Sequence, residues 1–185
     1  MGGKPVVWEA SQTFSGSWGY HRDEETWKSV DTLVKMLIDS VSKGGNLLLN
    51  VGPTGRGEFD VRALDRLSGM GEWMKRHDRS IYGCTQAPEE FACPEDCRYT
   101  CNPETNRLYL HVFSWPYRHI HLTGMTERIA YAQLLNDASE VIIRTSIPEE
   151  SFGAMKVRRD SSLLTLEVPV KKPDVTVPVI ELFLK

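Results

Sequence analysis

Apolar residues recur at two different spacings along the chain, and the change of spacing divides it into two halves. In the first half, apolar positions three and four residues apart predict a helix after Ser29, its N-cap, with Gly44 as the stop signal. A second helix is predicted beyond Asp60. One face of that helix carries Val61, Leu64, Leu67, Gly71 and Met74, with Trp73 beside it.

A short apolar run precedes each predicted helix and fits a β-strand. The first lies within Lys4 to Ala10 and ends at the charged Glu9. The second, Asn46 to Val51, is continuously apolar, as expected of a parallel strand with helices on both faces. The order strand, helix, strand, helix predicts an α/β unit. Two such strands have exposed edges and cannot complete a core alone, so we expect further strands to pair with them and expect the chain to be truncated.

From about Ser80 onward, apolar residues alternate with other residues, which is typical of strands. Turn signals such as Asn102-Pro103 and Lys172-Pro173 separate these runs at the intervals of a β-sandwich. We therefore predict two domains, an α/β domain over residues 1–83 and an all-β sandwich over residues 84–185. The alternating positions are Leu108, Leu110 and Val112, then Ile120 and Leu122, Leu164, Leu166 and Val168, and Val177 and Val179.

Length and charge narrow the classes of function. The chain has 185 residues, fewer than the roughly 250 of a complete eight-stranded α/β barrel. Its formal net charge of -3 provides no basic field for nucleic acid. No apolar run approaches the ~20 residues that span a bilayer, and the segment after Met1 lacks the apolar region of a secretion signal. We expect neither a nucleic-acid nor a membrane partner, and the cellular compartment stays open.

The glycines on both sides of the second strand suggest a phosphate-binding turn. Gly52, Gly55 and Gly57 are followed by Glu58, however, and fit neither a P-loop nor a dinucleotide-binding spacing. The alternative is a tight strand-to-helix turn that needs glycine for its backbone conformation. We therefore keep nucleotide binding as a third hypothesis, after the two that are given below.

The Trp8-Glu9 pair lies where the first strand is predicted to end. The carboxyl ends of barrel strands carry active sites, and a carboxylate held against an indole is desolvated, which raises its pKa toward the range of a general acid. Glu9 is therefore a candidate acid/base residue. The structural alternative is a glutamate paired with a neighbouring arginine or a backbone amide.

The loop from Ser17 to Asp23 gathers two aromatic residues, Trp18 and Tyr20, with a histidine, an arginine and an aspartate. Aromatic faces bind the apolar faces of sugars, and charged groups can bind hydroxyls, so the loop fits a saccharide pocket. Alternatively, the aromatic rings cap the adjacent core. Trp8, Trp18 and Tyr20 are the candidate substrate-binding residues.

The cysteines and histidines permit several interpretations. Three of the four cysteines are evenly spaced, which matches a zinc site poorly because such sites usually bring thiolates as two close pairs. A disulfide within residues 93–101, or free thiols, are the other interpretations. We expect the histidines of the second half to lie on strands at the surface, with His119 and His121 on the same side. These residues are Cys84, Cys93, Cys97, Cys101, His111, His119 and His121.

Read in order, several motifs resemble the C-terminal part of the α-L-fucosidases of glycoside hydrolase family 29. The longest covers Val41 to Pro53, and the resemblance continues into the predicted β-domain at Asn106 to Phe113, followed by Trp115-Pro116. The remaining motifs are Trp8-Glu9, Ser17-Trp18-Gly19-Tyr20, Arg66-Leu67, Gly71-Glu72-Trp73 and Ile81-Tyr82-Gly83.

This resemblance implies the last two strand-helix units of a (β/α)8-type barrel followed by a β-sandwich. It also implies a retaining hydrolase that acts on α-linked L-fucose in glycans, without a metal or organic cofactor, through an aspartate nucleophile. The family's nucleophile lies upstream of the matched part, so we expect the chain alone to be inactive. Glu9 matches a proposed acid/base of some members, and Trp18 matches an aromatic residue of the fucose pocket.

Two hypotheses of different classes therefore lead, with the nucleotide-binding protein third. The first is a part of a fucosidase, whose partners are a fucosylated glycan and either the missing barrel portion or a second copy paired through exposed strand edges. The second is a non-catalytic carbohydrate-binding or assembly module, in which the β-sandwich is the working part. The linkage preference and the oligomeric state are not encoded in these motifs.

Overall fold

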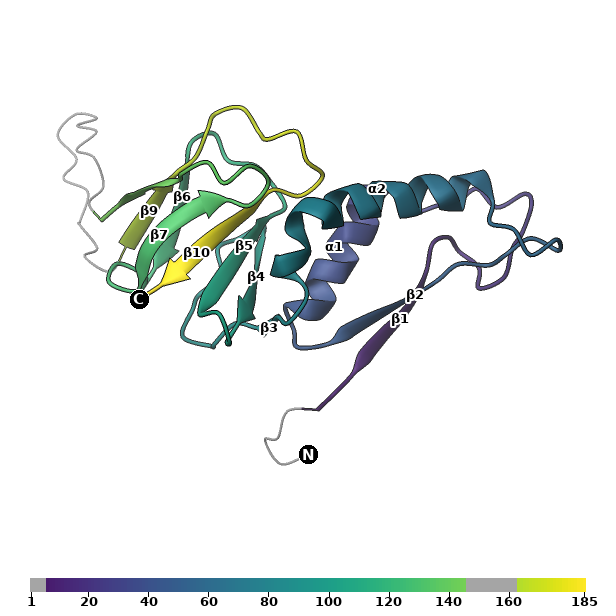
Figure 1. The fold of residues 1–185 in the computed structure, drawn as a ribbon, viewed down its shortest axis with the longest axis horizontal. Coiled ribbons are helices and arrows are strands. Elements are labelled where there is room, and N and C mark those ends of the chain that lie inside the picture. The colour runs from purple at the N-terminus through teal and green to yellow at the C-terminus, as the bar shows by residue number, and fades with distance from the viewer. Residues whose placement is uncertain (1–5, 146–162) are drawn as a thin grey trace.

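The computed structural model describes residues 6–145 and 163–185 of the chain (Figure 1). The first part contains β1 (Glu9–Thr13), α1 (Val30–Val41), β2 (Asn46–Asn50) and α2 (Val61–His77), followed by a short 3-10 turn, Asp78–Ser80. Strands predominate after this turn, as predicted. They are β3 (Thr85–Gln86), β4 (Cys97–Asn102), β5 (Arg107–Val112), β6 (His119–Thr123), β7 (Ile129–Leu134), β8 (Ile142–Arg144), β9 (Leu163–Glu167) and β10 (Val179–Leu184).

Both helices begin where the sequence predicts. The Ser29 side chain accepts a hydrogen bond from the backbone N–H of Thr32, and the Asp60 side chain accepts one from the backbone N–H of Arg62. These caps satisfy amide groups that have no partner within the first turn. Gly44 adopts a φ of 73°, which favours glycine and ends the first helical segment.

β1 and β2 pair in parallel, from Glu9 opposite Asn46 to Thr13 opposite Asn50. The prediction of a strand ending at Glu9 is wrong, because Glu9 begins β1. The apolar Val6 and Val7 lie before the strand and are 61% and 91% exposed, and Lys4 and Pro5 lie outside the described residues. Pairing with β2 fixes the ladder over the more polar Glu9–Thr13, so local hydrophobicity misplaced the strand.

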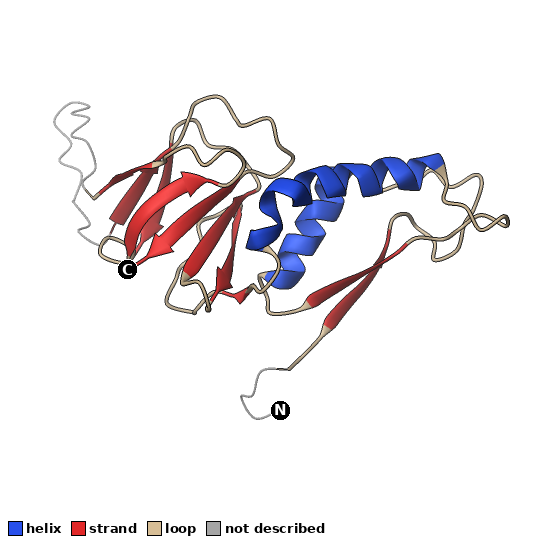
Figure 2. Ribbon diagram, in the orientation of Figure 1, coloured by secondary structure: helices blue, strands red, loops and turns tan. Residues whose placement is uncertain are grey.

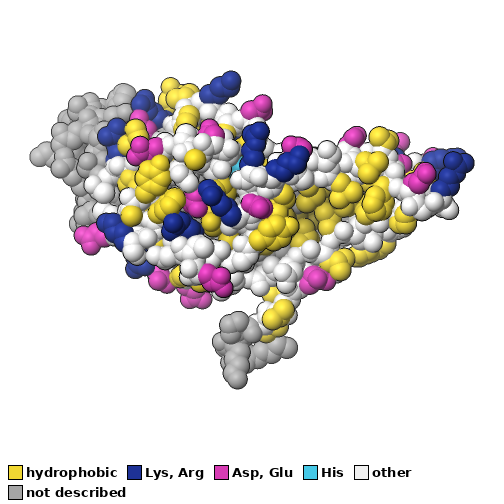
Figure 3. Space-filling model, in the orientation of Figure 1, with side chains coloured by type: hydrophobic (Ala, Val, Ile, Leu, Met, Phe, Trp, Pro, Cys, Tyr) yellow, Lys and Arg dark blue, Asp and Glu magenta, His cyan; other side chains and the backbone are white. Residues whose placement is uncertain are grey.

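The two-stranded sheet is open on one side. We expected β2 to be buried on both faces, but its residues are exposed or half-buried, and Leu48 is 45% exposed. Figure 1 shows the helices on one side of this sheet only. Most apolar side chains of α2 predicted to share a face are exposed as well, although Met74 packs against buried residues, and Figure 3 shows hydrophobic atoms along this part of the molecule. These α2 residues include Val61, Leu64 and Leu67.

The β-rich part closes its own core. A five-stranded sheet, in the order β3-β4-β5-β10-β7, and a three-stranded sheet, in the order β6-β9-β8, share one cluster of buried apolar side chains (Figure 2). Leu110 of the first sheet and Leu166 of the second are both fully buried within it. The predicted alternation is therefore confirmed from Leu108 to Val168 by residues that face this core, whereas Val177 and Val179 belong to a second core.

A second core joins the helices to the outer face of the five-stranded sheet. Val34 and Ile38 of α1 and Trp73 of α2 pack in one cluster with Val179 of β10. The Trp73 indole Nε1 also donates a hydrogen bond to the Val177 carbonyl at 2.8 Å. The five-stranded sheet thus has helices on one face and the three-stranded sheet on the other. Within the described residues, neither helix has the length and apolar composition needed to cross a membrane.

Candidate functional site

The loops that follow β1 and β2 form the carboxyl edge of the two-stranded sheet. Trp18 and Tyr20 lie in the first of these loops and are 58% and 38% exposed. A hollow at this edge measures about 10 Å³, room for about one water molecule. This edge alone therefore cannot enclose a sugar. The hollow is lined by Phe14, Ser15, Ser17, Gly19, Tyr20, His21, Glu24, Trp27, Asn50, Val51 and Gly52.

Two residues of the second loop hold the aromatic loop in place. Asn50, at the end of β2, donates a hydrogen bond from Nδ2 to the Trp18 carbonyl at 2.6 Å. A Cβ on Gly52 would lie only 2.5 Å from the backbone N of Tyr20, closer than Cβ contacts occur. Gly52 therefore permits the close approach that positions Trp18 and Tyr20.

A cationic side chain of α2 fixes the far end of the same loop. Arg62 donates from Nη1 to the Glu24 carbonyl at 2.8 Å, and its guanidinium lies 4.9 Å from the centre of the Trp27 ring. Lys28 donates from Nζ to the carbonyls of Thr13 and Ser15 at 2.7 and 3.0 Å. The loop is therefore anchored to both β1 and α2, which limits its freedom.

Glu24 is held as a carboxylate beside the hollow. Its oxygens accept hydrogen bonds from the side chain and backbone N–H of Thr26, and from the Ser17 hydroxyl at 3.0 Å. These bonds, those of the Thr26 side chain first, lower the pKa of Glu24 to about 2. Glu24 therefore stays ionised at neutral pH and suits loop anchoring rather than proton donation.

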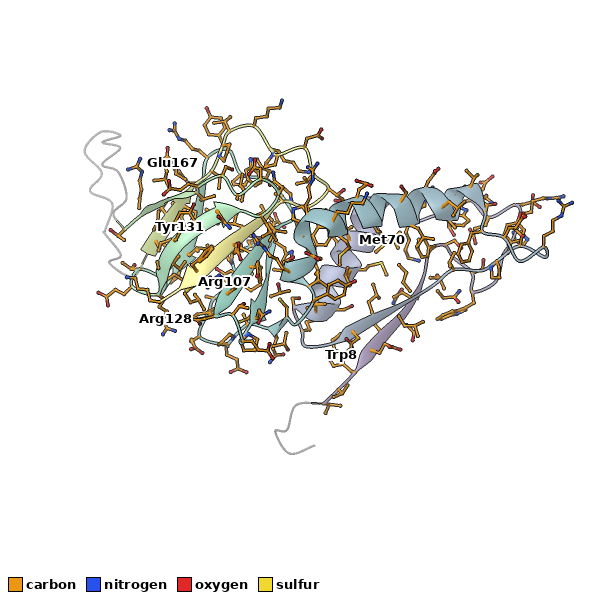
Figure 4. All side chains as sticks on the ribbon, in the orientation of Figure 1. Trp8, Met70, Arg107, Arg128, Tyr131 and Glu167 are labelled. Carbon is orange, nitrogen blue, oxygen red and sulfur yellow. The ribbon has the colours of Figure 1, made fainter. Side chains whose placement is uncertain are left out.

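Trp8, labelled in Figure 4, and Glu9 lie at the start of β1, whereas Trp18 and Tyr20 follow its other end. The Trp8 indole covers Gly45, where an added Cβ would lie 2.3 Å from the ring, and Nε1 donates to the Lys43 carbonyl at 3.2 Å. Glu9 is exposed. The structure therefore brings Trp18 and Tyr20 together but separates them from Trp8 and Glu9, contrary to the expected shared edge.

The glycine-rich turn after β2 does not offer a phosphate cradle. The backbone of Gly19 and Tyr20 fills the space against Gly52. At the start of α2, Asp60 places its carboxylate where an anion would bind, and the guanidinium of Arg62 pairs with that carboxylate at 2.8 Å. The geometry supports the tight-turn interpretation over nucleotide binding.

The four cysteines are free thiols in the structure. Cys93 is exposed. Burial raises the pKa of Cys84 and Cys97 to about 12, which disfavours the thiolate that a metal or an electrophile requires. Cys101 is also buried, on β4. Within residues 6–145 and 163–185, no three His, Cys, Asp or Glu side chains are grouped closely enough to hold a metal ion.

The expectation of surface histidines is wrong for His111. This residue is fully buried under α2, and its Nε2 lies 2.9 Å from the Thr100 hydroxyl. Its neighbours Leu110 and Val112 face the β-core, so the alternation places His111 on the opposite face of the strand. The sequence pattern does not show that the helices cover that face. His119 and His121 do lie side by side on β6, with ring centres 6.3 Å apart, as predicted.

Sequence reasoning missed three residues that build the edge: Glu24, Asn50 and Arg62. Asn50 could have been predicted, because a polar residue at the carboxyl end of an apolar parallel strand lies at the edge where ligands bind in such sheets. The contact of Arg62 with the loop spans 38 residues, and local patterns hold no information on it. Glu24 depends in turn on the loop conformation that Arg62 helps to fix.

Comparisons with known proteins agree with this arrangement. The family model for α-L-fucosidases matches residues 3–79. Plasma α-L-fucosidase of Rattus norvegicus is 38% identical over 116 residues, which are 60% of this chain and 25% of that protein. The α-L-fucosidase of Dictyostelium discoideum is 27% identical over 180 residues, or 95% of this chain and 37% of its own length.

Solved structures extend the match over the β-rich part. Isoenzyme 1 of the α-L-fucosidase from Paenibacillus thiaminolyticus matches with a TM-score of 0.86 and 38% identity, covering 99% of this chain and 41% of that one. An α-fucosidase of Thermotoga maritima, solved with a mechanism-based inhibitor, matches with a TM-score of 0.77 and 28% identity, covering 97% and 40%. The chain thus spans about a quarter to two fifths of these relatives. These matches support a member of the α-L-fucosidase family that covers the C-terminal portion of such enzymes.

Proposed function

We propose that β1-α1 and β2-α2 are the last two units of a (β/α)8-type barrel and that the strands after about Gly83 form a β-sandwich. The parallel pairing of β1 with β2 and the position of both helices on one side of them support the barrel assignment. The core shared by the two antiparallel sheets supports the sandwich. The proposed domains are residues 1–83 and 84–185.

We further propose that the chain is part of a retaining α-L-fucosidase. In that reaction an aspartate attacks the anomeric carbon as the bond to the leaving oxygen breaks and an acid residue protonates that oxygen; water then releases fucose. We assign the nucleophile to barrel strands upstream of this portion. We assign Trp18 and Tyr20 to the rim of the fucose pocket, and no step requires a metal or an organic cofactor.

The observation that carries this proposal is the structure of the carboxyl edge. Trp18 and Tyr20 present exposed aromatic rings there, on a loop held by Asn50 and Arg62, yet the hollow beside them encloses only about 10 Å³. Because sugar sites bury most of their ligand, this edge requires further walls. We propose that the upstream barrel strands provide them, so the chain alone does not turn over substrate.

The test is complementation of activity. The 185-residue chain is assayed with a chromogenic α-L-fucoside, alone and after co-expression with the upstream barrel portion of a close family member. We expect no hydrolysis above buffer from the chain alone and turnover from the combination. Hydrolysis by the isolated chain would show that the nucleophile lies within it and would overturn the proposal.

The role of Trp18 is tested in the complemented enzyme. Trp18→Ala removes an exposed ring from the pocket rim, so we expect the KM to rise by about tenfold with a smaller change in kcat. Trp115→Ala, outside the edge, is the matched control for the loss of an indole. An unaltered KM would remove Trp18 from the pocket.

The proposed acid/base role of Glu9 requires its carboxyl to reach the leaving oxygen. Glu9 begins β1 and Thr13 ends it, a separation of about 13 Å along the strand at ~3.3 Å per residue. A fall of kcat by about a hundredfold or more in Glu9→Gln, with rescue by azide, would support the role. A change below about tenfold would assign Glu9, with Trp8, to support of the amino end of the strand.

The second candidate is a non-catalytic carbohydrate-binding or assembly module. The independent core of the two antiparallel sheets favours it, because that core needs no residue of β1 or β2. It predicts saccharide binding without turnover, whether or not the barrel portion is added. Calorimetric titration beside the activity assay separates the two candidates.

A further inference from the structure

The outer face of the five-stranded sheet carries an ordered array of polar and aromatic side chains. The register of β10 with its two neighbours sets Phe183 between Arg107 of β5 and Tyr131 of β7. Two residues earlier, Glu181 lies between Tyr109 and Gln133. We call Arg107, Gln133, Tyr131, Glu181 and Phe183 the platform.

Exposure increases across the platform with distance from the helices. Tyr109 and Glu181 are almost fully buried, Phe183 is half-buried, and Tyr131 is 36% exposed. Figure 4 shows the labelled Tyr131 and Arg107 on either side of β10, and Figure 3 shows hydrophobic atoms beside basic side chains on this face. The platform is therefore a shallow surface bordered on one side by the helical part.

Contacts among its own side chains hold the platform rigid. The Arg107 guanidinium lies 3.8 Å from the centre of the Phe183 ring, and Tyr131 meets that ring edge-on at 5.3 Å and 74°. Such pairs stabilise one another. Binding of a ligand here would cost little side-chain conformational entropy, because these side chains are already ordered.

Polar groups are fixed next to these rings. Glu181 Oε2 accepts hydrogen bonds from Gln133 Nε2 at 2.7 Å and from Arg79 Nη2 at 2.8 Å. The amide nitrogen of Gln133 is therefore the donor to Glu181. Its carbonyl oxygen, Oε1, accepts no hydrogen bond from the described residues and can accept one from a ligand. Arg79 is half-exposed, so its remaining N–H groups are accessible to a ligand.

We propose that the platform binds a neutral saccharide. The apolar face of a pyranose ring would stack on the exposed Tyr131 ring, and its hydroxyls would donate to Gln133 and accept from Arg79 or Arg107. A shallow surface covers only one face of a sugar, so we expect weak binding, oriented by stacking on the aromatic ring and by the fixed polar groups beside it. The site is separate from the edge of Trp18 and does not depend on the proposed hydrolysis.

Charge and area favour a saccharide over two other occupants. Arg79 and Arg107 both face Glu181, the second at 3.7 Å, so the carboxylate offsets much of the positive charge that an anion would need. A stable dimer buries about 800 Å² on each partner, from some 20 residues or more. The five residues of the platform are far fewer than such an interface requires.

The test uses the 185-residue chain and four defined probes: methyl α-L-fucoside, methyl β-D-galactoside, methyl α-D-mannoside and lactose. Saturation-transfer NMR detects binding, and titration gives the Kd. For at least one probe we expect binding that Tyr131→Ala weakens by about tenfold and Gln133→Ala weakens as well. Tyr117→Ala is the matched control, because Tyr117 is an 80% exposed tyrosine of the same part of the chain.

Trp18→Ala separates this site from the proposed fucose pocket. Binding that survives Trp18→Ala and is weakened by Tyr131→Ala supports the platform, whatever the activity assay shows. Binding that is lost in Trp18→Ala and kept in Tyr131→Ala overturns it, as does a lack of binding by all four probes. Self-association that depends on Tyr131 would identify a second copy as the occupant and would also overturn it. Melting curves confirm that each variant is folded.

Discussion

The β-rich part and the two-stranded sheet with α2 differ in how completely they bury their apolar side chains. In the β-rich part, Leu108, Leu110 and Leu166 have no exposed surface, because two sheets close over them. In the two-stranded sheet and α2, by contrast, Leu48 and Leu64 are nearly half exposed, although the apolar residues there are spaced as regularly. A regular apolar pattern thus identifies the face that a partner covers but not whether that partner lies within the same chain.

The helices are the boundary between these two regions. They use one side to pack on the five-stranded sheet through Trp73 and Ile38, and leave another side of α2 uncovered. If the proposed barrel is correct, the uncovered side and the open face of β2 are where its other strands and helices pack. The contrast can be measured by making the same substitution in each region.

The largest effect is expected for Leu110→Ala in the closed core. Leu110 is fully buried on β5, so the truncation leaves a cavity and should lower the free energy of unfolding by about 2 to 5 kcal/mol. Urea denaturation followed by circular dichroism measures it. A loss below about 1 kcal/mol would mean that the two sheets do not form a tightly packed core.

Acid should act next, on the boundary between the regions, with an effect per pH unit that is smaller than the loss expected for Leu110→Ala. Burial, and then the charge of nearby His77, lowers the pKa of His111 to about 3. As the pH falls below the ordinary histidine pKa, about 6.5, the unfolded chain binds a proton that the folded chain does not. The stability should therefore decrease by up to about 1.4 kcal/mol per pH unit between about 6.5 and 3, and change no further above that range. Burial also lowers the pKa of His77, so this residue should further decrease the stability in acid.

His111→Gln tests this assignment. Its amide can donate to Thr100 in place of Nε2 but does not titrate, so the decrease in stability from pH 6.5 to 4 should become shallower. His121→Gln, on the exposed side of β6, is the matched control. Urea denaturation at each pH gives the slopes. An unchanged slope in His111→Gln would assign the acid sensitivity to other groups.

The sequence predicted the elements more reliably than their environment. The N-cap Ser29 is a local signal and was predicted, and the second helix begins just after Asp60, as expected. β1 was misplaced because its pairing with β2, together with the packing of Trp8 on Gly45, determines its register. β4 was not predicted, because its cysteines also suggested a metal site or a disulfide, although Cys97, Tyr99 and Cys101 alternate inward.

The candidate site was predicted in part for a similar reason. Trp18 and Tyr20 could be selected because two aromatic residues in a polar loop fit a saccharide pocket. Their supports, Asn50 and Arg62, act across 32 and 38 residues, and only the fold brings them to the loop. Placing Glu9 beside these aromatic residues required the correct end of β1, so one error in a strand boundary misplaced a candidate catalytic residue.

The smallest effect on stability is expected for Leu64→Ala, the same substitution as in the closed core. Leu64 is 49% exposed on α2, and alanine is the better helix former, so the free energy of unfolding should change by less than about 0.5 kcal/mol. Urea denaturation, run beside Leu110→Ala, measures the difference. Leu64→Asp should be tolerated in the isolated chain but should reduce complementation by the barrel portion, because it would place a charge in the apolar contact. A large loss of stability in isolated Leu64→Ala would show that the chain already covers this side of α2, and the contrast between the two regions would fail.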